Sequence, residues 1–509
     1  MTSTSKFIIT IDIGTTSTKA MAVDEQGGIR ASCSFPYPLH VPKPGYAEQD
    51  PDEMAAAVAK AVRKVMEDAD LRAADLHGIS FSSAMHSLIA IDGGGNRLTA
   101  CITWADQRSI RQADALKASG LGLDIYRRTG TPIHPMSPLC KLIWMKEQDE
   151  ETFRQADMFV GIKEYILHDW FGRYVMDYSI AGATGLFNIE TLNWDEGALA
   201  AAGVLASQLP ELVPTTAVLS GMRDSARQLL GLDVDVPVVI GSSDGVLANL
   251  GVGIVSSEAA AVTIGTSGAV RTTLSQPLTH PAGDLFCYCL TEQHWVIGGA
   301  VNNGGIALQW IKELLYDHVG EELSDRDVLT AMNEWAASVA PGSDGLLCLP
   351  LFTGERAPYY NANARGAFVG LTLSHKQRHM VRAVMEGVMY QIASVVRSME
   401  QLSGDIEELW ASGGFANSLL WRQMMADITG VATRVPDDIE SSGLGAAKLA
   451  LYALGVTPSI DPGWKKDGGS LYTVNERHHE VYEEILPIYR RTYEALKASF
   501  DEISEFQKS

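Results

Sequence analysis

Cysteine is scarce in this 509-residue sequence, and no long apolar run occurs in it. Six cysteines are too few for a disulfide framework in a chain of this length. Cys287 and Cys289 are two positions apart in a predicted strand, which places both on one face of it. No second Cys/His pair stands at the spacing of a zinc site. The apolar run near the N-terminus is short and includes Asp12, unlike a signal peptide, and no run approaches the ~20 residues of a membrane-spanning helix. We therefore expect a protein of the reducing cytoplasm that has no membrane partner.

Basic residues are also in short supply. The chain has 40 Lys and Arg against 62 Asp and Glu, which gives a net charge of -22. This balance disfavours a broad nucleic-acid surface and binding to anionic membranes. A single phosphorylated ligand stays compatible with it, because backbone donors bind phosphate locally whatever the net charge. The hydrophobic content of 46% is typical of a globular enzyme with two or three domains.

Two common phosphate-binding motifs are missing, and a pair of polar turns stands in their place. Without G-x-x-x-x-G-K-[ST] the chain is not a P-loop enzyme, and without G-x-G-x-x-G after a strand a Rossmann site is not expected. The stretch "IITIDIGTTSTKAMAVD" (8–24) predicts two strands joined by a turn, and "AAAVTIGTSGAVRTTL" (259–274) repeats that pattern half a chain later. The repeat predicts two related domains, each opening with a hairpin whose turn offers donors to phosphate.

Three further segments place glycines or an acid where ligands bind in α/β proteins. "SGGFANS" (412–418) and "GGAVNNGGIALQW" (298–310) have glycines before a predicted helix, which permits close backbone approach to a ligand. Asp244 follows the buried strand of "VPVVIGSSDG", at the strand end where ligands of open sheets collect. Asp244 is therefore a candidate general base, with a helix N-cap as the alternative interpretation.

Two longer segments carry a family resemblance. "MSPLCKLIWMKEQ" (136–148) and "GAFVGLTLSHKQRHMVRAVMEG" (366–387) resemble the two signatures of the FGGY carbohydrate kinases, in the family's order. With the paired turns, the resemblance covers essentially the whole chain. It implies two actin-like (ribonuclease-H-like) α/β domains, each a mixed sheet flanked by helices, with a deep cleft between them. The expected domains are 1–252, which binds sugar, and 253–509, which binds ATP, and the resemblance is compatible with a homodimer.

The resemblance also implies the residues of the phosphoryl-transfer site. Asp244 matches the catalytic base, and Asp12 with Asp244 would hold Mg²⁺ through waters. The residues implied to bind ATP are Gly14, Thr15, Thr16, Gly265, Thr266, Ser267, Gly304, Gly413, Gly414 and Asn417.

Within the family, the sequence is most similar to the members that phosphorylate gluconate at the 6-hydroxyl. The similar segments include "SSAMHSLIAID" (82–92) and "WADQRS" (104–109). Xylulose kinases, the runner-up, typically read Q-M-H-G where this chain has "AMHS" (84–87), and other polyol kinases follow. The residues implied to bind the substrate are Met85, His86, Trp104, Asp106, Arg108 and Lys163. Arg108 and Lys163 are the candidates for the cation that meets the carboxylate, with His134 as a third.

Some actin-like ATPases use paired turns without a sugar, and they are the competing class. The substrate cluster and both kinase signatures favour a kinase over that class.

Overall fold

The computed structural model describes residues 6–316, 325–436, 441–464 and 468–508. The chain divides into two compact units, and neither is a continuous stretch of sequence. Unit 1 comprises Met1–Val255, Thr273–Ile297 and Glu440–Lys466, and unit 2 comprises Ser256–Thr272, Gly298–Ile439 and Asp467–Ser509. The expected domains, 1–252 and 253–509, are continuous, and that boundary stays a prediction.

A six-stranded sheet forms the centre of unit 1, in the order β13-β14-β5-β1-β2-β3. Strands β1 and β2 pair antiparallel, whereas β1 with β5 and β5 with β14 are parallel. The predicted hairpin at the start of the chain is therefore confirmed, and its first strand lies inside the sheet. The strands are β1 (Phe7–Ile13), β2 (Ser17–Asp24), β3 (Ile29–Pro36), β5 (Leu76–Ser83), β13 (Val218–Leu219) and β14 (Val238–Ser243).

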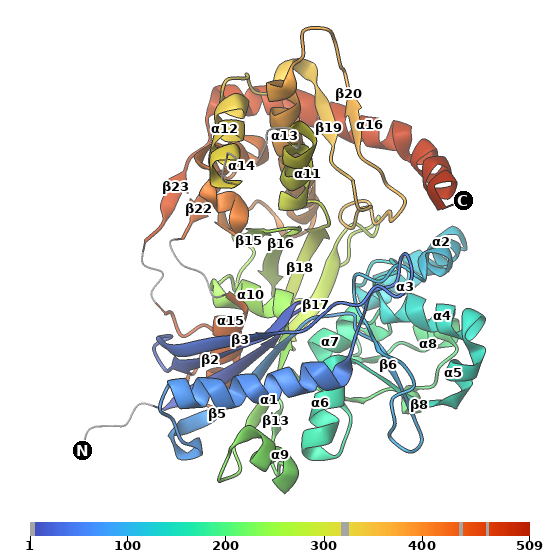
Figure 1. The fold of residues 1–509 in the computed structure, drawn as a ribbon, viewed down its shortest axis with the longest axis vertical. Coiled ribbons are helices and arrows are strands. Elements are labelled where there is room, and N and C mark those ends of the chain that lie inside the picture. The colour runs from blue at the N-terminus through green and yellow to red at the C-terminus, as the bar shows by residue number, and fades with distance from the viewer. Residues whose placement is uncertain (1–5, 317–324, 437–440, 465–467, 509) are drawn as a thin grey trace. The chain divides into compact units, whose positions relative to one another are not determined.

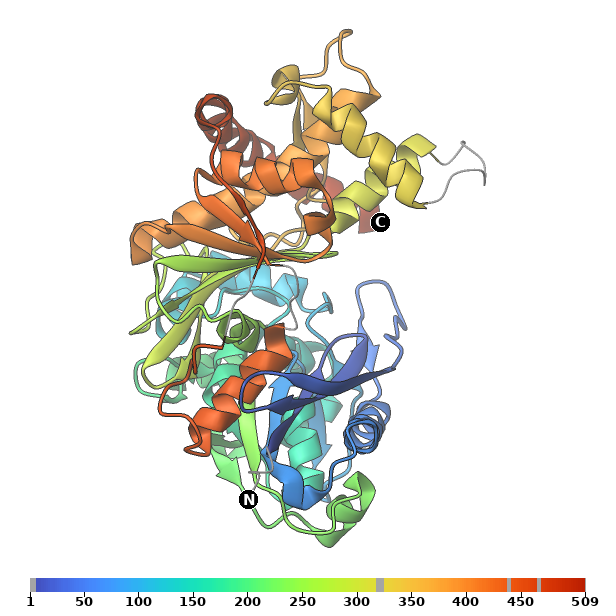
Figure 2. The same cartoon turned by 90° about the vertical axis from the view of Figure 1, so that its left-hand side faces the viewer.

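The two faces of this sheet are covered by helices from opposite ends of the chain. Helix α1 (Pro51–Asp68) covers one face, where odd-numbered β1 residues such as Ile9 and Ile11 join its apolar side (Figure 1). Helix α15 (Ser441–Ala453) packs on the other face, where Ile8 lies in one cluster with Ala447. Figure 2 shows α15, in orange-red, beside the dark blue strands. The period-2 alternation of a strand thus assigns even-numbered β1 residues, Asp12 among them, to the α15 face.

Helix α1 begins where the sequence signals a start. Asp50 is the N-cap and accepts a hydrogen bond from the backbone N–H of Asp52, and Pro51 occupies the first turn. The other strands of unit 1 are β4 (Glu48–Gln49), β6 (Ile89–Asp92), β7 (Cys101–Ile102), β8 (Ala156–Val160), β9 (Val175–Asp177), β10 (Phe187–Asn188), β11 (Asn193–Trp194), β12 (Glu211–Val213) and β17 (Phe286–Thr291). Its other helices are α2 (Ile110–Ala118), α3 (Leu121–Thr129), α4 (Pro138–Gln148), α5 (Glu150–Gln155), α6 (Ile162–Phe171), α7 (Tyr178–Ala183), α8 (Glu196–Ala202), α9 (Asp224–Leu230) and α10 (Asp244–Gly251).

Unit 2 repeats the arrangement of the first hairpin. Strand β15 pairs antiparallel with β16 and parallel with β21, as β1 does with β2 and β5. The sheet order is β17-β18-β16-β15-β21-β22-β23, with β17 and the first part of β18 assigned to unit 1. The duplication expected from the two turns is therefore present in the strand pairing. The strands are β15 (Ala259–Ile264), β16 (Gly268–Leu274), β18 (His294–Val301), β21 (Glu408–Ser412), β22 (Ala432–Val435) and β23 (Ser470–Tyr472).

The long helix α13 (Gln377–Ser403) is the buried centre of the helical layer in unit 2, where it packs against α11, α12 and α14. The remaining elements are α11 (Gly305–Tyr316), α12 (Asp325–Ala337), α14 (Leu419–Thr429), α16 (Glu476–Lys508), β19 (Leu347–Leu349) and β20 (Ala367–Val369). Within the described ranges, no helix combines the length and the apolar character that a membrane crossing requires.

Candidate active site

A row of polar side chains crosses the carboxyl edge of the unit 1 sheet. The strand register pairs Asp12 of β1 with Ser82 of β5, and Ser82 with Ser242 of β14. Asp244 follows β14 directly as the first residue of α10. Two interstrand spacings separate the backbones of β1 and β14, which is about 10 Å. Parallel strands thus bring Asp12 and Asp244, far apart in sequence, to one edge on either side of β5.

The Asp12 carboxylate is held from two sides. Ser82 Oγ donates to Oδ1 at 2.6 Å, and Ser442 Oγ donates to Oδ2 at 2.8 Å. Each oxygen keeps a second acceptor position, so the carboxylate stays able to bind water or a cation. The sequence did not identify Ser442 as a site residue, because a contact across 430 positions leaves no local pattern.

Asp244 is a helical residue and not an N-cap. Ser243 is the N-cap of α10, and Asp244 Oδ1 accepts a hydrogen bond from the Gly245 N–H at 2.6 Å. The N-cap alternative for Asp244 is therefore wrong. A carboxylate in the first turn of a helix lies at the positive end of the helix dipole, which is a favourable place for an acidic side chain.

The first turn, Gly14 to Thr16, is braced by side chains from three segments. Tyr37 Oη donates to Gly14 O at 2.6 Å, and Gln49 Nε2 donates to Thr15 O at 2.6 Å. Trp104 Nε1 donates to Thr15 Oγ1 at 2.8 Å. Because Thr15 Oγ1 accepts in this bond, its own proton is left to donate elsewhere. The turn is fixed on its protein side, while Thr16 is exposed.

A small cavity brings the first turn next to predicted substrate residues. Thr15, Met85 and Trp104 line it together, along with Gln49 and Thr103. Trp104 therefore contacts the turn and faces the cavity, which places a predicted sugar-binding residue against a predicted phosphate-binding one. All of these residues belong to unit 1.

His86 lies buried next to this cavity in an unusual backbone conformation. Its φ is +67°, in the left-handed region that non-glycine residues rarely adopt. Its Nδ1 bonds Ala183 O at 2.7 Å, and Nδ1 carries the proton because a carbonyl only accepts. The ring is thus fixed in one orientation, as a substrate-positioning group requires.

Lys141 holds the backbone of His86 by a hydrogen bond, a role that the sequence analysis did not predict. Its buried Nζ donates to His86 O at 2.6 Å and to Thr103 O at 2.7 Å. Burial lowers the pKa of the Lys141 ammonium to about 7. The sequence signal is the lysine inside the apolar "PLCKLIW" segment, where a buried cation needs several acceptors.

Asp106 and Arg108 form an internal ion pair. Asp106 is buried and accepts from the Ala47 N–H at 2.7 Å and from Arg108 Nε at 2.9 Å. Arg108 also pairs with Glu48, and its guanidinium lies 3.9 Å from the centre of the Tyr46 ring. The pair therefore anchors the loop before β4, and the charge of Arg108 is already balanced.

The charge of Lys163 is likewise balanced by a protein carboxylate. Its side chain is 1% exposed, pairs with the buried Asp177 and donates to Ile240 O at 3.2 Å. The third candidate, His134, accepts the Met136 N–H at Nδ1 at 3.2 Å. A ligand carboxylate at Arg108 or Lys163 would have to replace a protein carboxylate, and the identity of the cation stays a prediction.

The second turn, in unit 2, is held by the start of α11. Gly265 N–H donates to Ser267 O, two residues along, at 2.9 Å, whereas in the first turn Gly14 N–H donates to Ser17 O, three residues along, at 3.0 Å. Gly304 N–H donates to Thr266 O at 3.0 Å. A Cβ on Gly304 would lie 2.8 Å from the Ser267 carbonyl carbon. Gly304 is thus required for packing against the turn, and its N–H points to the turn.

The glycine pair at 413 and 414 lies at the same sheet edge as the second turn. Thr263 pairs with Ser412 in the parallel β15–β21 register, so the segments after both strands are neighbours. Gly413 has φ +101°, and a Cβ there would lie 2.3 Å from Ile264 O, directly before the turn. Gly414 and Asn417 bound a short 3₁₀ helix, and the space around Gly414 is open. The predicted nucleotide residues of unit 2 therefore gather at one edge.

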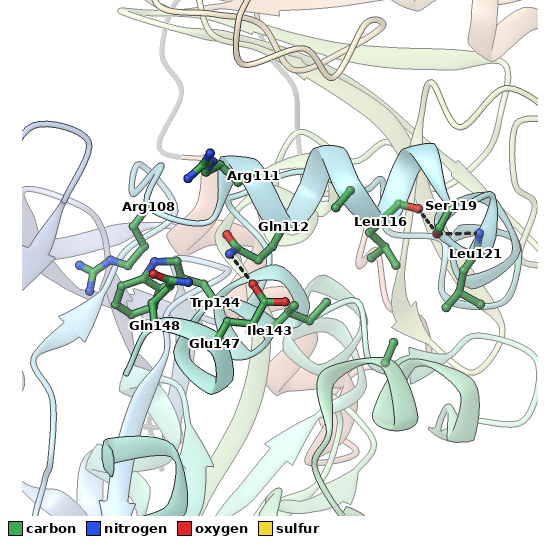
Figure 3. Close-up of a pocket in the computed structure, with 12 residues that line it drawn as sticks. Arg108, Arg111, Gln112, Leu116, Ser119, Leu121, Ile143, Trp144, Glu147 and Gln148 are labelled. Carbon is green, nitrogen blue, oxygen red and sulfur yellow. Dashed lines mark hydrogen bonds between the residues drawn. The ribbon is translucent and has the colours of Figure 1, made fainter. Parts of the chain in front are cut away.

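A larger cavity of about 510 Å³, with Arg108 in its lining, lies in unit 1 (Figure 3). Arg111, Gln112, Trp144 and Glu147 line it, and Gln112 Nε2 donates to Glu147 Oε2 at 2.8 Å. Its lining includes neither Asp12 nor Thr15. Its size is adequate for a small ligand, but its residues are separate from the polar row.

A divalent cation at Asp12 would need ligands beyond protein side chains. Within the described ranges, no group of three or more His, Cys, Asp or Glu residues is placed to hold a metal. One carboxylate surrounded by hydroxyls fits Mg²⁺, which retains most of its waters. The buried Ser242 Oγ in the same row makes no hydrogen bond to the protein, which leaves an oxygen available to such waters.

The two units repeat one hairpin-and-parallel-strand arrangement with a glycine-rich turn in each, and unit 1 has two carboxylates at its sheet edge. These features, with the structural matches given below, are those of an α/β phosphotransferase of the actin-like fold. The chain belongs to the FGGY family of carbohydrate kinases. The model of the family's N-terminal domain matches residues 7–251, and that of its C-terminal domain matches 260–454.

Individual relatives match over nearly the whole chain. The gluconokinase of Bacillus licheniformis is 44% identical over 510 residues, covering 99% of this chain and 98% of the relative. The crystal structure of gluconate kinase from Lactobacillus acidophilus matches with a TM-score of 0.92 at 35% identity, covering 98% of this chain and 100% of that one. The ligand-bound xylulose kinase from Lactobacillus acidophilus matches with a TM-score of 0.91 at 36% identity, with the same coverage.

Proposed function

We propose that this kinase transfers the γ-phosphoryl group of ATP to the 6-hydroxyl of D-gluconate, giving 6-phospho-D-gluconate. The observation that carries the phosphoryl transfer is the placement of Asp12 and Asp244 at one sheet edge of unit 1. The observation that favours gluconate is the 44% identity to a relative named gluconokinase.

Asp244 is the proposed general base. Its carboxylate accepts the proton of the 6-hydroxyl as that oxygen attacks the γ-phosphorus, and the bond to the β,γ-bridging oxygen breaks. Hydroxyl and N–H groups of Thr15 and Thr16 in unit 1 would donate to phosphate oxygens, where negative charge must be held. In unit 2, ATP binding is assigned to Thr266, Ser267 and the segment 413–417.

Mg²⁺, when bound, neutralises charge on the phosphate oxygens. Asp12 and Asp244 are the residues that would hold it, through waters. The residues around the polyol have the complementary task of orientation. Met85, His86 and Trp104 supply an apolar wall and a fixed imidazole, and the Asp106–Arg108 pair fixes the neighbouring loop.

A screen of acceptors tests the proposal. ADP release is measured with gluconate, D-xylulose, L-ribulose, glycerol and erythritol, and the phosphorylated position is read by ³¹P NMR. We expect gluconate to give the highest kcat/KM, by about 10²-fold or more, since a site built to pair a polar group rejects ligands that lack it. D-xylulose is the main alternative, because one structural relative at 36% identity is a xylulose kinase. A preference for D-xylulose over gluconate would overturn the assignment of gluconate as the substrate. ADP release that ignores every polyol would instead indicate an ATPase.

A further inference from the structure

We propose that Ser442 is a positioning residue for Asp12, supplied to unit 1 by a helix from the far end of the chain. This inference deepens the proposed function, since it concerns how the proposed cation-binding carboxylate is oriented. Ser442 Oγ donates to Asp12 Oδ2 at 2.8 Å, opposite the bond from Ser82. Neither serine was among the residues implied by the family resemblance.

Strand alternation makes this contact possible. Asp12 lies on the α15 face of β1, together with Ile8 and Thr10, while Ile9 and Ile11 face α1. Gly443 follows Ser442, and a Cβ on it would lie 1.9 Å from Met21 Cε and 3.3 Å from Thr10 Oγ1. Glycine at position 443 lets the first turn of α15 approach β1 and β2 without displacing the Met21 side chain, and that approach brings the Ser442 hydroxyl to the carboxylate.

The first turn of α15 is also packed against α10, the helix that begins with Asp244. A Cβ on Gly445 would lie 1.9 Å from Leu247 O, and a Cβ on Gly251 would lie 1.8 Å from Ser441 O. Lys448 adds a polar tie, since its buried Nζ donates to Leu250 O at 3.2 Å and pairs with Asp461 Oδ1 at 2.9 Å. The backbones of the two helices therefore pack without intervening side chains, and the same helix pair fixes Asp244 and the donor to Asp12.

The chemical consequence concerns rotation of the Asp12 carboxylate. An aspartate χ2 torsion is broad, so one donor leaves the second oxygen free to swing. One hydroxyl on each oxygen fixes both, and the remaining acceptor positions then point in set directions. Such outer partners of metal-binding groups typically change metal affinity by about 10- to 100-fold when removed.

The test compares Ser442→Ala with two matched variants in the full chain. Ser442→Thr keeps the hydroxyl, and Ser441→Ala alters the neighbouring serine, which is not one of the two side-chain donors that hold Asp12 among the described residues. Calorimetry measures binding of a non-hydrolysable ATP analogue with and without Mg²⁺, and steady-state rates are measured against Mg²⁺ and polyol.

For Ser442→Ala we expect the Mg²⁺ concentration at half-maximal rate to rise about 10-fold. Analogue binding should weaken only when Mg²⁺ is present, and KM for the polyol should stay as in the wild type. Ser442→Thr should restore most of the loss, Ser441→Ala should match the wild type, and Asp12→Asn should not be worsened by adding Ser442→Ala.

Three results would overturn the inference. They are an unchanged Mg²⁺ dependence in Ser442→Ala, an equal weakening of analogue binding without Mg²⁺, and additive effects of Ser442→Ala and Asp12→Asn. A lowered melting temperature without the Mg²⁺-specific change would assign Ser442 a structural role only. The calorimetric arm needs no phosphoryl acceptor, so it reports on Ser442 even if gluconate is not the substrate.

Discussion

Asp244 has two proposed roles, as the general base and as a residue that holds Mg²⁺ through waters, and the Asn variant tests the first of them. Asn is isosteric and keeps an acceptor oxygen for the Gly245 N–H, which the aspartate holds at 2.6 Å. We expect Asp244→Asn to bind ATP and gluconate with near wild-type affinity, while kcat falls by about 10²-fold or more, the range of a lost general base. Rapid-quench turnover and calorimetric affinities measure the two effects separately. Near-normal turnover would remove Asp244 from the role of base.

Lys163 offers a second residue-scale prediction, one that distinguishes folding from substrate binding. It is buried with Asp177, so Lys163→Met leaves a buried carboxylate without its cation. We expect a loss of about 3–5 kcal/mol in the free energy of unfolding. Urea denaturation measures it, and Lys163→Met with Asp177→Leu should recover part of the loss. A variant of normal stability with a raised KM for gluconate alone would instead support the substrate role.

The burial of Glu164 leads us to expect that the free energy of unfolding depends on pH. Burial raises the pKa of its carboxyl from 4.5 to about 7. Between these values the folded chain keeps a proton that the unfolded chain has released, so the free energy of unfolding falls as the pH rises. Glu164→Gln does not titrate, so its stability relative to the wild type should increase from pH 4.5 to pH 7, by up to about 3 kcal/mol. Urea midpoints at pH 5 and pH 8 check the sign, and a difference that shrinks over this range would contradict the assignment.

At the scale of elements, a substitution in the second turn can test the role of the Thr266 side chain separately from that of its backbone. Thr266→Val removes a hydroxyl but leaves the backbone carbonyl that accepts the Gly304 N–H. We expect KM for ATP to rise by about 10-fold or more, and KM for gluconate to change less, because one hydrogen bond to a charged group contributes about 1.5–3 kcal/mol. Thr266→Ser, which keeps the hydroxyl, is the control. A larger effect on the gluconate KM would overturn the assignment of this turn to the nucleotide.

The elements themselves could be predicted where the sequence signal is local. Alternating apolar residues around a Gly-Thr turn predicted both hairpins, and the start of α1 has the local signal of an N-cap residue, Asp50, followed by Pro51. The parallel neighbours β5 and β21 place Asp12 beside Ser82 and Thr263 beside Ser412, but pairing between distant strands leaves no pattern in one sequence. The same reason hid Ser442, and the ion pairs of Arg108 and Lys163 depend on side-chain burial that a motif does not encode.

At the scale of the whole molecule, the two units exchange segments, and this affects any attempt to divide the chain. The fragment 1–252 would retain Ile8, Met21 and Val239 but lack Ala447 and Leu451, which complete that apolar cluster. It would also lack Leu285, whose carbonyl accepts a hydrogen bond from Tyr126 Oη at 2.7 Å. An uncovered apolar sheet face favours aggregation.

We therefore expect the fragment 1–252 to be largely insoluble or to bind a hydrophobic dye strongly. Appending residues 441–464 through a flexible Gly/Ser linker should increase the soluble yield, because α15 then returns to its face of the sheet. Soluble yield and dye fluorescence of the two fragments, expressed side by side, measure the difference. A monomeric 1–252 fragment with a cooperative unfolding transition would show that α15 is not needed to complete the core of unit 1.

The contribution of α15 to the first strand also sets an order of events during translation. Domains commonly fold as they emerge from the ribosome, N-terminal domain first. Here Ile8 and Asp12 belong to the first strand made, yet their partners Ala447 and Ser442 are synthesised near the end of the chain. One face of the unit 1 sheet must therefore wait, uncovered, through most of translation, and the proposed cation-binding carboxylate acquires its full set of partners only when the polypeptide is almost complete.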